Sequence, residues 1–251
     1  MTIAAYWMLS ENFGDRITPW LIGKIRGEAP AWVPMGFDAE HYVVCGSILN
    51  HANAHAMVWG AGLANLADVV NNETTIFAVR GPLSRARALS CGAKCPPVYG
   101  DPALLLPRFY DVPKEKKYRL GYVPHYTDQF RVFERYAGEH IVNILGSVEK
   151  VIDDIRSCER IVSSALHGLV IAHAYGIPAA WVKWGDSIGG DVGTKYRDFL
   201  ASIGLDIPYP LDRRESKDEI PLDAFARSDG KRLKDIQDTL WGVCPIRRSG
   251  E

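Results

Sequence analysis

The sequence has no apolar run that approaches the ~20 residues of a membrane-spanning helix, so it does not predict an integral membrane protein. It also has little excess charge. The 29 Lys and Arg and 30 Asp and Glu residues leave a net charge of −1, which does not favour binding to nucleic acid. The first residues lack the basic segment and cleavage site of a signal peptide and are interpreted as a first strand. These absences point to an ordinary soluble globular protein.

Signals for metals and nucleotides are also missing. The five cysteines are odd in number and scattered, and only Cys91 and Cys95 are close together, so no zinc site is completed. Reduced thiols in a cytoplasm are the simplest interpretation. There is no phosphate-binding P-loop motif, and the glycines at residues 60–62 lack the third glycine of a dinucleotide fingerprint. We therefore expect neither a metal nor a cofactor.

What the sequence does have is an alternation of strand-like and helix-like segments, typical of α/β proteins with parallel sheets. The 251 residues suffice for two domains. We place the first at residues 1–112 and the second at 113–251, joined by the proline-rich and charged residues 107–117, and expect the last helix to pack back on the first domain. Both domains are predicted to be Rossmann-like, with a cleft between them.

Local signals give approximate boundaries. Asp15 is predicted to cap a helix that begins near Arg16, and proline in the first turn favours a helix at 82–90. Further helices are expected at residues 129–136, 148–156, 165–175, 194–203 and 231–241. Strands are expected at residues 2–8, 32–35, 42–45, 56–59, 75–79, 119–123, 140–145, 161–164 and 179–182.

The most informative stretch is residues 161–183, which have the proportions of a strand, a tight turn, a buried helix and a second strand. His167 lies where the first strand turns into the helix. Ligands of open α/β sheets bind at that edge, close to the positive end of the helix dipole. A histidine among apolar residues is also commonly a satisfied core residue, so both interpretations stay open. His173, in the helix interior, is interpreted as a core or interface residue.

Because two such domains normally turn their strand ends toward a shared cleft, polar residues at those ends are candidate ligand contacts. Cations, imidazoles and helix N-termini together suit a small anion and acid–base chemistry. The candidates are Asn12, Asp15, Gly46, Ser47, Arg80, His125, Ser163, Ser164, His167 and Lys195.

These segments resemble the polysaccharide pyruvyl transferase family over most of the chain. The resemblance is carried by Asn12-Phe13-Gly14-Asp15, residues 44–49, residues 58–62, residues 79–84, Gly100-Asp101-Pro102, residues 123–126 and residues 163–178. It implies a glycosyltransferase-B-like fold of two Rossmann-like domains, with the acceptor on the side of the first and the donor on the side of the second. It also implies transfer of the enolpyruvyl group of phosphoenolpyruvate onto a sugar of a bacterial exopolysaccharide, leaving a pyruvate ketal.

The resemblance assigns the catalytic role to His167 and anion binding to Arg80 and Lys195. Gly81 follows Arg80 where the family usually has an acidic residue, and Ala165 stands where some members have arginine. The other substrate-binding residues that we predict are Asn12, Asp15, His125, Ser163, Ser164 and Gly168. Glycine beside His167 is expected to let a substrate approach the backbone, and His167 itself, at a cleft edge, to contribute little to the core.

The resemblance implies a cytoplasmic enzyme with phosphoenolpyruvate and a glycan or lipid-linked oligosaccharide as its partners. Contact with the inner membrane face would use the basic pairs at residues 213–214, 231–232 and 247–248, although dispersed pairs are more often plain solvated surface. Two alternatives remain, because a fold alone does not decide a function. One is a nucleotide-sugar glycosyltransferase of the same architecture, and the other is a non-catalytic sugar- or anion-binding module.

Overall fold

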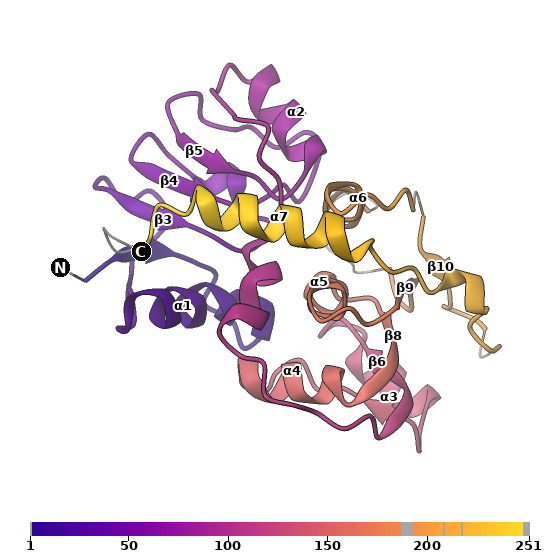
Figure 1. The fold of residues 1–251 in the computed structure, drawn as a ribbon. Coiled ribbons are helices and arrows are strands. Elements are labelled where there is room, and N and C mark those ends of the chain that lie inside the picture. The colour runs from indigo at the N-terminus through magenta and orange to yellow at the C-terminus, as the bar shows by residue number, and fades with distance from the viewer. Residues whose placement is uncertain (1, 187–192, 208, 217, 248–251) are drawn as a thin grey trace.

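The computed structural model of the protein describes residues 2–186, 193–207, 209–216 and 218–247. In this part of the chain two parallel sheets lie one after the other along the sequence (Figure 1). The first sheet has the order β2-β1-β3-β4-β5, and the second β10-β9-β8-β6-β7. If each sheet is numbered from its own first strand, both have the order 2-1-3-4-5. This is a doubly wound, flavodoxin-like order, so the prediction of two Rossmann-like halves with parallel sheets is confirmed.

The strands and helices are short. The first sheet contains β1 (Ala4–Tyr6), β2 (Ala31–Trp32), β3 (His41–Val43), β4 (Ala56–Trp59) and β5 (Thr75–Ala78). The second contains β6 (Tyr118–Val123), β7 (His140–Ile141), β8 (Cys158–Ser163), β9 (Ala179–Lys183) and β10 (Leu211–Asp212). The α-helices are α1 (Phe13–Arg26), α2 (Pro82–Ser90), α3 (Gln129–Arg135), α4 (Val148–Arg156), α5 (Leu166–Ala174), α6 (Thr194–Ser202) and α7 (Gly230–Gly242), and the 3₁₀ helices are η1 (Leu49–His51), η2 (Pro102–Arg108) and η3 (Leu222–Ala224). No helix of the described residues is both long and apolar enough to cross a bilayer.

Most elements form near their predicted positions, but β1, β2 and β7 are shorter than the strands predicted at residues 2–8, 32–35 and 140–145. Pro82 occupies the first turn of α2, and Ser147 caps α4 by accepting the backbone N–H of Lys150. The prediction that Asp15 caps a helix starting near Arg16 is wrong: α1 begins at Phe13, and Asp15 lies inside its first turn. The helix starts early because Phe13 is fully buried and donates its backbone N–H to Ile144 of the other half.

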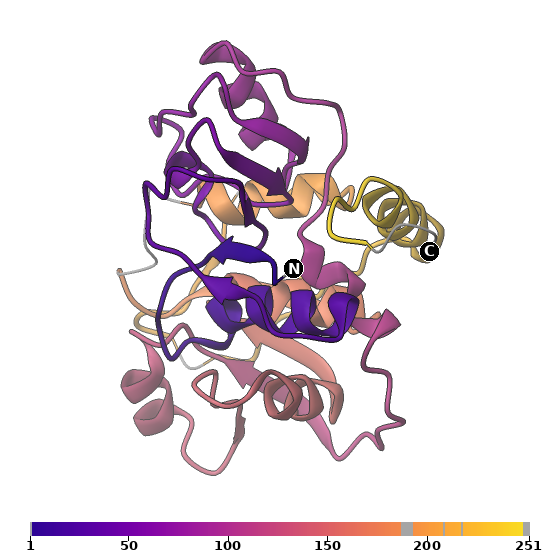
Figure 2. The same cartoon turned by 90° about the vertical axis from the view of Figure 1, so that its left-hand side faces the viewer.

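One hydrophobic core is shared by both halves. It runs from one face of the first sheet, through the side chains of α1, η2, α5 and α7, to one face of the second sheet. Helices α1 and α4 lie side by side across the junction, where the Trp20 indole donates a hydrogen bond to Glu149 (Figures 1 and 2). Two smaller cores cover the opposite faces of the sheets. The halves are therefore packed against each other through apolar surface rather than joined only by a linker.

The last helix crosses back to the first half. Figure 1 shows α7 running from the second half across to the first. The fully buried Trp59 donates its indole N–H to the carbonyl of Leu240 at 3.0 Å, and Gln237 donates to the carbonyl of Leu104 at 2.7 Å. The domain boundary predicted at residues 112 and 113 falls between η2 and β6.

His173 is a core residue in α5. It is 1% exposed, neither ring nitrogen has a hydrogen-bond partner among the described residues, and burial lowers its pKa to about 4. All nine residues of α5 are buried, as its nearly continuous apolar sequence predicts.

We expect His173 to make the protein sensitive to acid. Its pKa is about 4 in the folded state and near 6.5 in an unfolded chain, so protons bind preferentially to the unfolded state as the pH falls from 6.5 to about 4. This one group should remove roughly 3 kcal/mol of unfolding free energy across that window. Urea unfolding at pH 7 and pH 4 checks it. Between pH 7 and pH 4, His173→Leu should lose less unfolding free energy than the wild type, whereas the exposed His55→Leu should lose as much as the wild type. Equal losses in His173→Leu and the wild type would contradict the assignment.

Candidate functional site

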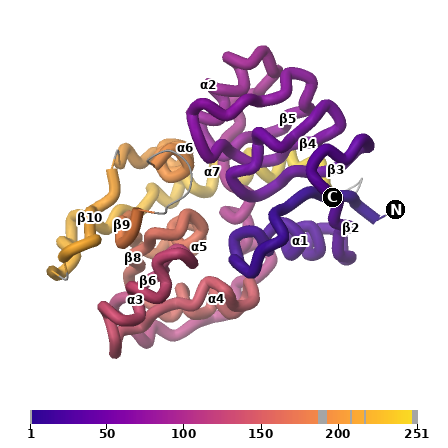
Figure 3. Tube along the Cα trace, turned by 180° about the vertical axis from the view of Figure 1, so that it is seen from behind, coloured from indigo at the N-terminus to yellow at the C-terminus, as the bar shows by residue number. Residues whose placement is uncertain are grey.

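In both halves, the segments that follow the first and third strands of the sheet line the same cavity. In an open α/β sheet of this strand order, ligands bind beyond the carboxyl ends of the strands where the order reverses, which is between the first and third strands. Those strands are β1 and β3 in the first half and β6 and β8 in the second. The segments that follow all four of them line a cavity of about 610 Å³, as does the start of α6. Figure 3 shows α1, α5 and α6 grouped around the centre of the molecule.

The cavity wall contains most of the polar residues predicted for the site. Its lining is Met8, Ser10, Asn12, Phe13, Asp15, Gly46, Ser47, Ile48, His125, Tyr126, Thr127, Ala165, Leu166, His167 and Lys195. The structure therefore brings together polar residues from four separate segments of the chain: Asn12 and Asp15, His125, His167, and Lys195. A volume of this size is typical of small-molecule sites and exceeds the needs of a three-carbon ligand alone.

Lys195 supplies positive charge in this wall. It stands in the first turn of α6, and no hydrogen bond or ion pair joins it to another described residue. Burial, and then the charge of Arg80, lower its pKa to about 8 against the opposing effect of Asp15. The helix α5 adds its N-terminus, which no side chain caps. A poorly solvated ammonium beside an uncapped helix N-terminus is suited to an anion.

His125 and Asp15 shape the rest of the wall. Burial, and then the charge of Lys195, lower the pKa of His125 to about 4, so this imidazole is neutral near pH 7. Its Nδ1 lies 2.7 Å from the hydroxyl of Thr127. Asp15 accepts hydrogen bonds from the side chains of Ser10 and Asn12 and so fixes the loop after β1.

His167 lies at the junction of the two halves. It is 8% exposed, and its ring forms part of the cavity wall while packing edge-on against Phe13 with centroids 6.2 Å apart. A Cβ at Gly14 would lie 2.3 Å from Nδ1, so only glycine permits this approach of α1 to the imidazole. The expectation that His167 contributes little to the core is therefore wrong, because the ring fills space between α1 and α5.

Asp101, to which we assigned no role from the sequence, lies behind His167. This carboxylate is fully buried at the start of η2, and its Oδ2 is 3.6 Å from Nε2 of His167. Burial raises the pKa of Asp101, but the neighbouring imidazole of His167, the N–H of Ala103 and the charge of Arg80 outweigh it and leave the pKa below its ordinary value. The sequence signal was the Asp in Gly100-Asp101-Pro102 after the strand-like residues 98–99.

Arg80 does not line the cavity, contrary to its predicted role as a direct ligand contact. Its guanidinium is fully buried and pairs with Asp198 of α6 at 3.2 Å. It also donates to the carbonyl of Leu63 at 2.6 Å and to the hydroxyl of Ser47 at 2.8 Å. Its acidic partner is thus distant in sequence instead of adjacent. Among these partners, Ser47 is in the cavity wall.

Three further predicted contacts point away from the cavity. The hydroxyl of Ser163 donates to backbone carbonyls of Val123 and Ala165, and that of Ser164 donates to Asp128. Both serines are fully buried, so they shape the turn before α5 instead of facing a ligand. Gly168 faces Ser163 and Val123, where a Cβ would lie 2.4 Å from the serine hydroxyl. Its role is close packing of α5 on the sheet, which corrects the expectation that it admits substrate.

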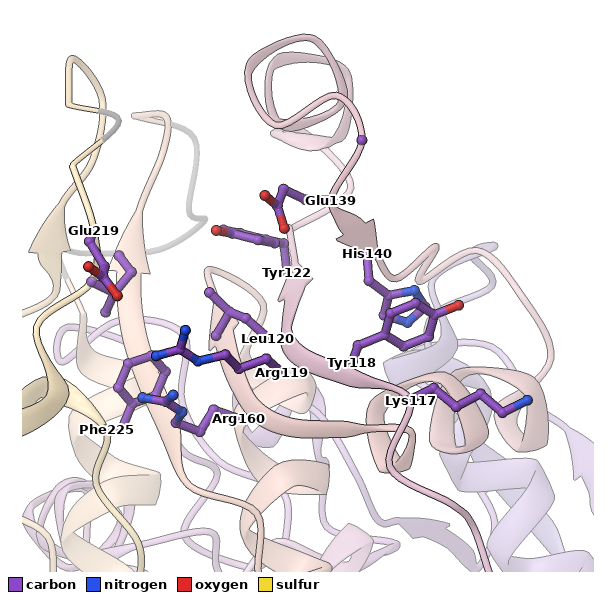
Figure 4. A pocket seen from close by; sticks show the side chains of 12 residues that line it. Lys117, Tyr118, Arg119, Leu120, Tyr122, Glu139, His140, Arg160, Glu219 and Phe225 are labelled. Atoms are coloured by element: carbon purple, nitrogen blue, oxygen red, sulfur yellow. The ribbon is translucent and has the colours of Figure 1, made fainter.

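A second cavity, of about 660 Å³, lies elsewhere in the second half (Figure 4). Many of its lining residues come from the early parts of β6, β7 and β8, away from the carboxyl ends where ligands of such sheets bind. It contains a stacked pair, Tyr118 and His140, with ring centroids 3.8 Å apart, and Arg160 over the ring of Phe225. None of the residues predicted for the site is in its lining, so the smaller cavity is the candidate site.

Comparison with known proteins identifies the family. The sequence model of the polysaccharide pyruvyl transferases matches residues 39–187, which is more than half of the chain and includes Ser47, Asp101, His125 and His167. The chain belongs to the polysaccharide pyruvyl transferase family. It is therefore a transferase, as the motifs predicted. Asn12, Asp15 and Lys195 lie outside the matched range.

Two curated proteins are similar over most of the chain. An uncharacterized protein of Acanthamoeba polyphaga mimivirus is 27% identical over 216 residues, which are 80% of this chain and 74% of that protein. The succinoglycan biosynthesis protein ExoV of Rhizobium meliloti (strain 1021) is 28% identical over 221 residues, 80% of this chain and 64% of that protein. No solved structure matches. The likeness to glycosyltransferase-B enzymes stays a prediction.

Replacing Arg80 should destabilise the fold. Arg80→Met leaves the Asp198 carboxylate buried without its cation, and breaking a buried pair in this way typically costs about 3–5 kcal/mol. Denaturant unfolding measures the loss. Arg16→Met, which removes an exposed partner of Glu11, is the control and should cost less than about 1 kcal/mol. A similarly small cost for Arg80→Met would show that water reaches the buried pair.

Lys195 should dominate anion binding. Lys195→Gln removes the ammonium and should weaken binding of inorganic phosphate by about 10- to 100-fold, since hydrogen bonds to charged groups contribute about 1.5–3 kcal/mol. In the wild type, affinity should fall as the pH rises through about 8, because the ammonium then loses its proton. Calorimetric titration tests both effects, with the exposed Lys231→Gln as control. Equal affinity in both variants would remove Lys195 from the site.

Proposed function

We propose that the protein transfers the enolpyruvyl group of phosphoenolpyruvate onto two hydroxyls of an exopolysaccharide sugar, forming a pyruvate ketal and releasing phosphate. The observation that supports this best is the pairing of an anion-binding wall, centred on Lys195, with an imidazole, His167, in one cavity at the switch points of both sheets. Family membership supports the pyruvyl group. The similarity to ExoV, named for succinoglycan biosynthesis, supports an exopolysaccharide acceptor.

Phosphoenolpyruvate suits this wall because it carries a phosphate and a carboxylate on a small carbon frame. Lys195 would meet one of them as a point charge, and the uncapped N-terminus of α5 the other. Asn12 and Ser47 offer further polar contacts, and the remaining volume would hold the acceptor sugar. The donor's charge is thus balanced by groups of the chain, and no metal or cofactor is part of the proposal.

The proposed reaction has two additions to one carbon. A proton is added to the methylene carbon of the donor, and a first sugar oxygen bonds to the middle carbon and loses its own proton. The bond from that carbon to the phosphate oxygen then breaks, and phosphate leaves with the electron pair. A second sugar oxygen bonds and loses its proton. One of the two released protons replaces the one used on carbon, and the other is carried away by phosphate. His167 would move these protons, a task that suits imidazole near neutral pH.

Location and membrane contact are also proposals. Acceptors built on a lipid carrier would place the enzyme in the cytoplasm, at the inner face of the membrane. Of the basic pairs that would contact lipid headgroups, Arg214 is already held by Asp212 and Asp186. Arg213 is held by Ser216 and the carbonyl of Glu219, and Arg248 lies outside the described residues. The first pair therefore gives little support to membrane contact.

The direct test incubates the protein with phosphoenolpyruvate and a panel of glycosides and measures phosphate release together with formation of the ketal by mass spectrometry. Release that depends on the glycoside, and that persists with a chelator present, is the expected result. Parallel reactions with nucleotide sugars test the glycosyltransferase alternative. Nucleotide release in those reactions, with no phosphate from phosphoenolpyruvate, would overturn the proposal.

Substitution of His167 should separate catalysis from stability. His167→Gln is expected to lower kcat by roughly 10²–10⁴-fold, the usual contribution of general acid–base catalysis. Because the ring is packed against Phe13 and Gly14, some loss of melting temperature is expected as well. His173→Gln, on the same helix, is the matched control and should lower the melting temperature while leaving kcat per folded molecule nearly intact. A fully active His167→Gln protein would contradict the catalytic assignment of His167.

A further inference from the structure

A carboxylate of the first half and an imidazole of the second face each other in the centre of the molecule. Oδ1 of Asp101 accepts the backbone N–H of Ala103 at 3.0 Å, and so caps η2. Oδ2 of Asp101 and Nε2 of His167 are both buried, and neither has a hydrogen-bond partner among the described residues. They lie 3.6 Å apart. Burying a carboxylate oxygen and an imidazole nitrogen without hydrogen bonds costs free energy, unless the two groups interact with each other.

The surroundings of Asp101 favour its ionised form. The buried thiol of Cys45 also interacts with Asp101: burial, and then the charge of Asp101, raise the pKa of this thiol well above its usual range. The thiol therefore stays protonated and does not compete for negative charge. Arg80 adds a cation to the same environment. On the cavity side, the groups near His167 are Asp15, His125 and Lys195.

We propose that Asp101 is the positioning residue of His167. Its carboxylate accepts the proton on Nε2, which fixes the ring and leaves Nδ1, beside Gly14, as the nitrogen that exchanges protons with substrate. It also stabilises the imidazolium that forms when Nδ1 takes a proton. The 3.6 Å separation exceeds a hydrogen bond, and such contacts in ligand-free sites commonly tighten when substrate binds. The effect on catalysis rests on the proposed function, whereas the effect on the ring does not.

The sharpest variant is Asp101→Asn. An amide retains the oxygen that caps η2, but it turns an NH₂ group toward Nε2 and so requires that nitrogen to be an acceptor. The ring proton should then move to Nδ1, which is the wrong tautomer for the proposed role. We expect kcat to fall by about 10²-fold or more with little change in KM for phosphoenolpyruvate, because Lys195 holds the donor.

The proton position can be read on the full chain without any substrate, from the ¹⁵N NMR signals of the imidazole, assigned by their loss in His167→Gln. The expected result is a proton on Nε2 in the wild type and on Nδ1 in Asp101→Asn. Asp229→Asn, which alters the aspartate that caps α7, is the matched control and should change neither the tautomer nor kcat. A proton on Nδ1 in the wild type, or an unchanged tautomer in Asp101→Asn, would overturn the proposal.

A second variant guards against loss of the fold. Asp101→Ser keeps a good capping group but removes the carboxylate. Exchange of the Nε2 proton with water should be at least about 10-fold faster than in the wild type, because its acceptor is gone; unchanged exchange counts against the proposal. The outcomes also separate the two proposals. A tautomer switch without pyruvyl transfer would leave the positioning role standing and reject the proposed function, and transfer without a switch would do the reverse.

Discussion

The ion pair between Arg80 and Asp198 sets the geometry on which the cavity depends. The cation follows β5 in the first half, and the carboxylate belongs to α6 in the second. The same carboxylate accepts the backbone N–H groups of Leu83 and Ser84, and so caps α2 across the junction. Gly81 lies so close to α6 that a Cβ would be 1.9 Å from the carbonyl oxygen of Asp198. A buried pair of this kind is weak evidence for stability, but it fixes the position of α6 and thereby of Lys195.

The shared strand order explains why one cavity serves both halves. Each sheet has its switch point between its first and third strands, and the segments that follow the strands at both switch points line the same cavity. Charges therefore converge from segments that are remote in sequence. Asp101 and His167 are one such pair, and Arg80 and Asp198 another. In both pairs each half contributes one partner, so neither half alone holds a complete set of groups.

Much of the fold was predictable because its signals are local. The helices at residues 82–90 and 148–156 and the strand at 56–59 were predicted with the observed bounds, from a proline in the first turn, an amphipathic pattern and an apolar run. The 3₁₀ helix η2 was missed because two prolines within seven residues are typical of a linker. Strand β10 has two residues, too few for a pattern to emerge.

The site was partly predictable for a different reason. Position at a strand end identified His167, His125, Asn12, Asp15 and Lys195, since the sheet topology alone brings such residues to one edge. Side-chain direction is not contained in that rule. Arg80, Ser163, Ser164 and Gly168 also lie at or just after strand ends, yet their side chains or Cα atoms face the protein interior. Asp101 was overlooked because Gly-Asp-Pro is a common turn sequence. Its role depends on His167, which lies 66 positions later in the chain.

The return of α7 to the first half has a consequence for the order of events during synthesis. Trp59 is enclosed only when Leu240 lies over it, and Gln237 covers the carbonyl of Leu104 in the same way. Domains commonly begin to fold as soon as they leave the ribosome. Here the amino-terminal half emerges first but lacks part of its covering until nearly the whole chain has been translated. The amino-terminal half is thus synthesised first but completes its folding last. Until then its exposed apolar surface could aggregate with other chains unless it is protected.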